Sequence, residues 1–170
     1  QRYYDVTKGS VKVDGVDVRD MTQKELRDKL GYVPQKGVLF SGTIDSNIRY
    51  GKPEITDAQV KEAAEVAQAT EFIDTKPEKY ESPVSQGGTN VSGGQKQRLS
   101  IARAIAKDPE IFIFDDSFSA LDFKTDSQLR KALKEYTKDA TTVIVAQRIS
   151  TILGADQIIV LDDGHMAGIG

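Results

Sequence analysis

The sequence predicts an α/β domain built on a mainly parallel sheet. Strand and helix signals alternate along the chain, as they do in sheets whose strands are connected by helices. The run Ile111–Phe114 is wholly apolar, too short for a helix and flanked by charged residues, which is typical of a strand buried on both faces of a parallel sheet. Over Thr56–Phe72, apolar side chains recur at helical spacing and predict an amphipathic helix.

The start of the chain favours short extended segments. Val11–Val13 alternates as a strand does and closes in a turn at Asp14-Gly15. Tyr32-Val33 is expected to be extended because Pro34 disfavours helix at the residue before it.

Three helices are predicted to begin with a capping box, in which a hydroxyl residue precedes Glu or Gln by three positions. The pairs are Thr22 with Glu25, Thr56 with Gln59, and Ser92 with Gln95. The helices expected from them span Met21–Leu30, Thr56–Phe72 and Ser92–Lys107. Asp108-Pro109 ends the last of these.

The remaining segments complete an alternating pattern. Thr125–Tyr136 predicts a helix, and Val143–Val145 and Ile158–Leu161 predict two further buried strands. Lys76–Asn90 is loop-like because of its prolines and glycines. Because the first half is less regular than the second, we expect a helical subdomain over about residues 40–90.

Composition limits the class of protein. The chain has 170 residues, of which 38% are hydrophobic and 29% charged, with a net charge of -3, which suits one compact domain and argues against broad binding to nucleic acid. It has no cysteine, which excludes disulfides and thiolate metal sites, and its single histidine, His165, is expected on the surface. No apolar run approaches the ~20 residues that cross a bilayer, and the first residues do not resemble a signal peptide.

Two short motifs carry chemistry. Ser92-Gly93-Gly94-Gln95 opens a helix, where glycines let phosphate oxygens approach free backbone N–H groups. A capping box alone would explain the first and last of these residues, but not two consecutive glycines, which cost about 1 kcal/mol each in a helix. Asp115-Asp116 follows the apolar strand, at the edge of the sheet where ligands collect, and a carboxylate there can hold a hydrated Mg²⁺. The alternative is a solvated strand end.

These two motifs, followed by Ser119–Asp122, resemble the nucleotide-binding domain of ABC transporters, a P-loop NTPase-like fold with a helical signature subdomain. The resemblance covers nearly all of residues 1–170, with the helical subdomain at about 40–90 and the signature helix starting at 92. It implies ATP and Mg²⁺ as cofactors and a location at the cytoplasmic face of the membrane.

The resemblance also implies a role for each matched residue. Ser92, Gly93, Gly94 and Gln95 match the signature motif, which contacts ATP held by the opposite domain of a dimer. Asp115 matches the aspartate that coordinates Mg²⁺, Gln35 matches the Q-loop glutamine near Mg²⁺ and the attacking water, and Asp122 lies in the D-loop. The segment Leu39–Ile48 looks like the exporter version, which abuts transmembrane coupling helices. The transported small molecule would bind elsewhere.

Three departures from the family pattern bear on activity. The Walker A pattern G-x-x-x-x-G-K-[ST] does not occur, so we expect the chain to begin after that loop and to lack the family's N-terminal strands. Asp116 stands where the family has a catalytic glutamate, and Gln147 where it has a switch histidine.

Asp116 and Gln147 together resemble the degenerate half of a heterodimeric exporter, whose site binds ATP without turning it over well. The alternative is a non-hydrolytic interaction module that supplies the signature motif to a partner ATPase. A chromosome-maintenance ATPase is disfavoured, because the 57 positions from Gln35 to Ser92 leave no room for that group's long coiled coil.

Overall fold

A three-stranded parallel sheet forms the centre of the computed structural model, which describes residues 2–170. The strands are β3 (Leu30–Val33), β6 (Ile111–Asp115) and β7 (Thr141–Val145), in the order β3-β6-β7. Both pairings are parallel, with Phe114 opposite Val33 on one side and Ile144 on the other. The predicted α/β architecture is therefore confirmed.

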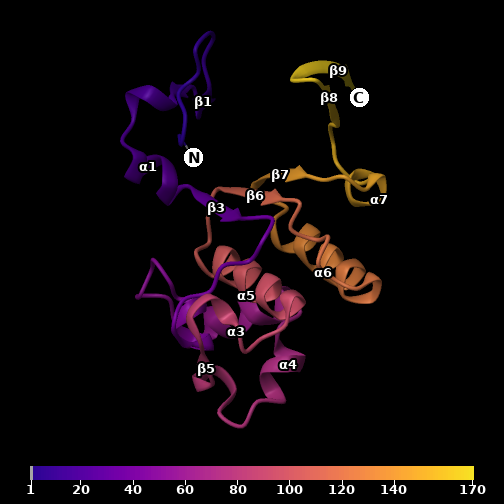
Figure 1. Cartoon of the computed structure of the whole chain (residues 1–170). Helices are drawn as coiled ribbons and strands as arrows, with labels where there is room; N and C mark the ends of the chain where they lie inside the picture. The colour runs from indigo at the N-terminus through magenta and orange to yellow at the C-terminus, as the bar shows by residue number, and fades with distance from the viewer. Residues whose placement is uncertain (1) are drawn as a thin grey trace.

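The longer helices lie on one side of this sheet (Figure 1). The α-helices are α1 (Gln23–Asp28), α2 (Ile44–Ile48), α3 (Asp57–Val66), α4 (Thr70–Asp74), α5 (Gly93–Ala106), α6 (Phe123–Tyr136) and α7 (Ile149–Ile152). Short 3₁₀ turns, η1 (Val18–Asp20), η2 (Lys79–Glu81) and η3 (Gln86–Gly88), and the strand pair β4 (Gly42–Thr43) and β5 (Pro83–Val84) fill the connections. Helices α2 and α3 pack against α5, whose other contacts include β3.

The core lies between α5, its neighbouring helices and the sheet. Leu99, Ile101 and Ile105 of α5 are fully buried, as are Phe112 and Phe114 of β6. Each such side chain contributes about 1.5–3 kcal/mol when it is removed from water. This packing holds α5 rigidly beneath the strand ends that carry the candidate site.

The capping boxes predicted for three helices are all present, and they set where α1, α3 and α5 begin. Two helix ends were predicted wrongly. Leu30 belongs to β3 instead of the preceding helix. The helix expected over Thr56–Phe72 is two helices, because Gln68 adopts a left-handed φ of 56° and the chain turns sharply before α4.

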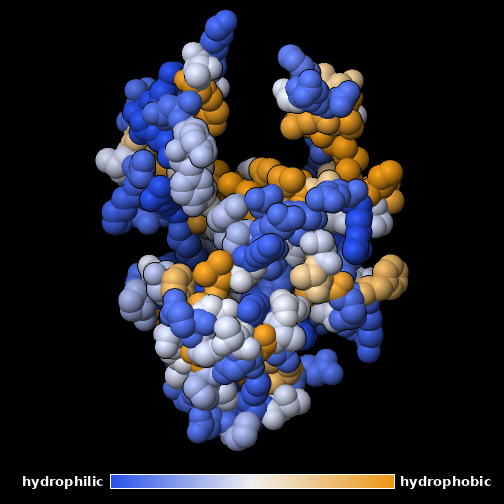
Figure 2. Space-filling view, viewed as in Figure 1, coloured by the Kyte–Doolittle hydropathy of each residue, from blue (hydrophilic) through white to orange (hydrophobic). Residues whose placement is uncertain are grey.

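The strands expected to be buried near the carboxyl end are exposed. Val143 and Val145 of β7 are 47% and 52% exposed; they point to the same face of the sheet, and the longer helices lie on the other side. Strand β8 (Ile159–Asp162) pairs within residues 2–170 only with β9 (His165–Ile169), in an antiparallel hairpin. Figure 2 shows apolar side chains gathered on β7 and this hairpin.

At the other end, β1 (Lys12–Val13) and β2 (Val16–Asp17) form the expected hairpin. Its turn places Asp14 and Gly15 at φ values of 52° and 79°, which glycine and aspartate tolerate best. His165 is exposed, as predicted. Among the helices of residues 2–170, none combines the length and the apolar character needed to cross a membrane.

Candidate functional site

The parallel sheet brings three sequence-predicted residues to one edge. Gln35 follows β3, Asp116 follows β6 and Gln147 follows β7, and parallel strands end at the same edge. The side-chain amides of Gln35 and Gln147 both donate to Oδ2 of Asp116, over 3.3 Å and 3.4 Å. The carboxylate of Asp116 is therefore held between two neutral amides.

The backbone holds Asp116 in a defined place. Its φ of 44° lies in the left-handed region, which costs a non-glycine residue about 1–3 kcal/mol. Its N–H donates to the carbonyl of Val145 over 2.9 Å, and the Ser119 hydroxyl donates to its carbonyl over 3.0 Å. The buried hydroxyl of Ser117 donates to the carbonyl of Val33 over 2.8 Å. These bonds join the ends of all three strands around one carboxylate.

Asp115, the last residue of β6, has a phenol as its partner. The Tyr32 hydroxyl donates to Oδ2 of Asp115 over 3.1 Å. Burial, and next the hydrogen bond to Asp115, raises the pKa of Tyr32, so the phenol stays protonated and keeps its donor role. In residues 2–170, no group of three or more His, Asp or Glu side chains surrounds a common point. A single carboxylate suits a hydrated Mg²⁺ that takes its other ligands from water and phosphates.

The glycine motif lies at the start of α5. Ser92 caps the helix, accepting from the Gln95 N–H over 3.2 Å, while Gln95 Oε1 accepts from the Ser92 N–H over 3.0 Å. No acceptor within residues 2–170 contacts the N–H of Gly93 or Gly94. A Cβ built on Gly93 would meet no atom within 4 Å, and one on Gly94 would lie 3.5 Å from the Ala120 carbonyl oxygen. The capping box is real, and the two glycines beside it leave an open helix start.

The structure does not join this helix start to the carboxylates. In the part of the chain that it describes, no hydrogen bond or ion pair links Ser92–Gln95 to Asp115, Asp116 or Gln147. Asp122 caps α6, accepting from the Thr125 N–H over 2.9 Å. Hydrogen bonding to the Thr125 side chain, and next to its N–H, lowers the pKa of Asp122. The candidate residues thus form two groups, one at the sheet edge and one at exposed helix starts.

Sequence reasoning missed the polar residues that position others. Tyr32 donates to Asp115 and Ser117 donates to Val33, in each case on the neighbouring strand, and no local sequence pattern predicts such hydrogen bonds. Gln97 did leave a signal, since it is a polar residue on the apolar face of α5 with Ile101 and Ala104. It is 1% exposed and binds the segment that carries Gln35.

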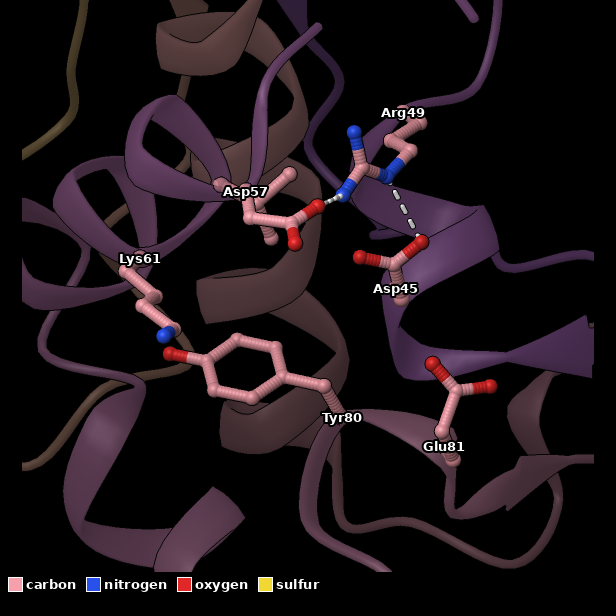
Figure 3. Close-up of a pocket in the computed structure, with 7 residues that line it drawn as sticks. Asp45, Arg49, Asp57, Lys61, Tyr80 and Glu81 are labelled. Carbon is pink, nitrogen blue, oxygen red and sulfur yellow. Dashed lines mark hydrogen bonds and ion pairs between the residues drawn. The ribbon is translucent and has the colours of Figure 1, made fainter.

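A separate polar cleft of about 270 Å³ lies among α2, α3 and η2; none of the predicted nucleotide or metal residues lines it, but Asp45 of the segment Leu39–Ile48 does (Figure 3). Arg49 crosses it, pairing with Asp45 over 2.7 Å and with Asp57. The hydrogen bond to Asp45 raises the pKa of Arg49, and burial opposes that shift. The cation of Arg49 is therefore already paired with two carboxylates of the cleft wall.

Comparison with known proteins identifies the family of this chain. The chain is 48% identical over 172 residues to an ABC transporter ATP-binding protein of Mycobacterium tuberculosis, covering 99% of this chain and 29% of that protein. It is 46% identical over 169 residues to a Staphylococcus aureus ATP-binding/permease protein named for multidrug export, with the same coverage. The chain thus spans under a third of the length of these relatives.

A solved structure of a bacterial Atm1-family ABC exporter with ATP bound matches with a TM-score of 0.95 and 41% identity, over 99% of this chain and 30% of that one. The family model for ABC transporters matches residues 1–119, which include the glycine motif, both strand-end aspartates and Gln35. With the fold, the motifs and these matches in agreement, the chain belongs to the ABC transporter family.

Proposed function

We propose that this chain is the ATP-binding domain of an ABC exporter, and that it couples ATP binding and hydrolysis to export of a small molecule. The Staphylococcus aureus relative is named as an ATP-binding/permease protein, and both relatives are more than three times as long as this chain. The domain would act at the cytoplasmic face of the membrane, contacting the coupling helices of a transmembrane part. The transported molecule would bind in that part.

Each residue at the sheet edge has a proposed role. Asp115, oriented by Tyr32, would hold Mg²⁺ through water, and Gln35 would face the metal and the attacking water. When bound, Mg²⁺ would supply positive charge that stabilises the charge developing on the phosphate oxygens. Asp116 would orient the attacking water, with Gln147 beside the terminal phosphate. Catalysis of phosphoryl transfer depends on such positioning and on electrostatics.

The arrangement around Asp116 carries the proposal that this site hydrolyses ATP poorly. Its carboxylate is one methylene shorter than a glutamate, which withdraws it by about 1.5 Å, and misplacements of ~1 Å can cost 10²-fold in rate. Both neighbouring amides already donate to the same carboxylate oxygen. Gln147 can donate a hydrogen bond but cannot take the charge that an imidazole takes.

The partner would be a second nucleotide-binding domain with a competent site, so that the assembly is a heterodimer. The open start of α5 supports this, because the free N–H groups of Gly93 and Gly94 suit a phosphate from outside the chain. The same feature favours a second candidate, a non-hydrolytic module that supplies only this helix start to a partner ATPase. The two candidates differ in whether the site of this chain turns over ATP at all.

Turnover of Mg-ATP by the complete transporter separates the candidates. The double variant Asp116→Glu/Gln147→His should raise turnover at this site by up to about 10²-fold, because it returns the carboxylate and the imidazole. The matched control Asp139→Glu/Gln157→His makes the same two exchanges at exposed positions and should change nothing. If the first double variant turns over no faster than the control, the impaired-site proposal is wrong and the interaction module stands.

A further inference from the structure

A fully buried amide connects α5 to the segment that carries Gln35. Gln97 is 1% exposed, and both ends of its side chain are used. Its Nε2 donates to the carbonyl of Pro34 over 3.0 Å, and its Oε1 accepts from the N–H of Gly37 over 2.9 Å. The two hydrogen bonds bracket Gln35, one before it and one after it.

Close packing of Gly37 against α5 reinforces the hydrogen bonds of Gln97. A Cβ built on Gly37 would lie 2.9 Å from the backbone carbon and oxygen of Lys96 and from the hydroxyl of Ser100, so the segment rests directly on α5. Further along, Arg103 of α5 donates to the carbonyl of Val38 over 2.9 Å. Gln35 itself is exposed, and the residues on either side of it, Pro34 and Gly37, are both hydrogen-bonded to α5.

The helix that holds this bridge also carries the open N-terminus. Gly93 and Gln97 are four residues apart on α5, which is about 6 Å along a rigid helix. The amide of Gln35 lies 3.3 Å from the carboxylate of Asp116. Gln97 therefore holds the backbone on either side of Gln35, and Gln35 in turn contacts Asp116, so the helix that begins at Gly93 is linked to the carboxylate through the backbone of residues 34–37.

We propose that Gln97 is a positioning residue that makes Gln35 follow the movements of α5, so that contact at the start of this helix is transmitted to the Asp116 carboxylate. The role of Gln35 in this statement rests on the proposed function. The tie between Gln97 and residues 34–37 stands on the contacts alone. Without Gln97, Gln35 would lose its place relative to Asp116 while α5 kept its fold.

Hydrogen exchange in the complete transporter tests the tie directly. Gln97→Met keeps the length and volume of the side chain but can neither donate to Pro34 nor accept from Gly37. Amides in the peptide covering residues 35–39 should exchange about tenfold faster, as expected for a lost buried hydrogen bond, while peptides from α5 keep their protection. Unchanged exchange in residues 35–39 would overturn the proposal.

Ser100→Ala is the matched control. The hydroxyl of Ser100 is buried on the same face of α5, next to Gly37, and has no hydrogen-bond partner among residues 2–170. Its removal should leave exchange in residues 35–39 unchanged. If Gln97→Met also loosens α5, Gly37→Ala replaces it, since the added Cβ pushes the segment off the helix without altering the sequence of α5. Faster exchange confined to residues 35–39 then supports the tie, and its absence contradicts it.

Turnover distinguishes positioning from a general structural role. In the Asp116→Glu/Gln147→His background, Gln97→Met should lower kcat about tenfold and leave the KM for ATP unchanged. When Gln35 is already alanine, Gln97→Met should lower kcat no further, and an equal further loss would overturn the proposal. If Gln35→Ala alone leaves kcat unchanged, the proposed role of Gln35 fails, and hydrogen exchange still decides whether Gln97 ties the segment.

Discussion

Replacing Gly93 by alanine separates what the start of α5 does for the fold from what it does for a ligand. Gly93 is the first residue of the helix, its φ is ordinary, and an added Cβ would meet no atom within 4 Å. Alanine is favoured over glycine in helices, so the domain should gain about 0.5–1 kcal/mol of stability. For a domain of this size, that gain raises the unfolding transition by roughly 1–4 °C.

The same methyl group should damage nucleotide contact. It would stand beside N–H groups that have no acceptor among residues 2–170 and that we assign to a phosphate held by the partner domain. A lost hydrogen bond to a charged group is worth about 1.5–3 kcal/mol, which corresponds to roughly 10–100-fold in rate. We therefore expect a protein that is more stable and turns over ATP at least tenfold more slowly.

The assay measures thermal unfolding and Mg-ATP turnover on the same preparation of the complete transporter. Gly154→Ala is the control, because this exposed glycine also has ordinary φ and open space for a Cβ. It should change turnover by less than the error of the assay. A Gly93→Ala variant that is more stable and keeps its full turnover would refute the contact, and one that unfolds several degrees lower would refute the structural argument.

Three further outcomes are expected. Tyr32→Phe removes the donor to Asp115 and should raise the Mg²⁺ concentration for half-maximal ATP binding by about 3–10-fold, measured by titration with a fluorescent nucleotide. Arg103→Met removes three hydrogen bonds made by a guanidinium whose pKa burial lowers to about 10. The variant also avoids the desolvation cost of that buried charge, about 3 kcal/mol. The free energy of unfolding, measured with denaturant, should therefore fall by a net amount of about 2–5 kcal/mol. The hydrogen bond from Arg19 lowers the pKa of Asp17 to about 2. The stabilisation from this pair is therefore complete above about pH 4 and is lost as the pH falls towards 2. Asp17→Asn should remove that part of the acid transition in circular dichroism, and an unchanged transition would show that the pair contributes nothing.

Local chemistry explains which parts of the fold the sequence predicts well. A capping box is satisfied by residues three positions apart, so the starts of α1, α3 and α5 follow from the sequence alone. The apolar run of β6 does form a central strand of the parallel sheet, but only one of its faces is fully buried: Phe112 and Phe114 are buried, whereas Ile111 and Ile113 are partly exposed. The parallel topology explains why Gln35, Asp116 and Gln147 lie at the same edge of the sheet. Their hydrogen bonds do not follow from the sequence.

What the sequence could not show depends on partners distant in the chain. The apolar residues of β7 predict burial, but side-chain burial depends on what covers each face of the sheet, and the longer helices lie on one side of it, which leaves Val143 and Val145 exposed on the other face. The break at Gln68 lies inside a periodic pattern, and the Gln68 carbonyl accepts from the half-buried Arg98 over 2.7 Å. Nothing in the sequence distinguishes Tyr32 from other aromatic residues in strands, and only the structure shows that its hydroxyl donates to Asp115.

Helix α5 links the candidate residues at the sheet edge to those at its own start, although no hydrogen bond or ion pair within residues 2–170 joins the two groups directly. Its first turn is exposed, with open space at Gly93, and one turn later on the same side of the helix Gln97 is buried and binds the backbone on both sides of Gln35. A substitution at the exposed turn removes contact with a ligand and leaves the tie intact, so Gly93→Ala should keep the hydrogen-exchange protection of residues 35–39. Gln97→Met should lose that protection while the helix start stays open. If both variants loosened residues 35–39 equally, the helix would be transmitting a general loss of packing, and the separation of roles along α5 would be wrong.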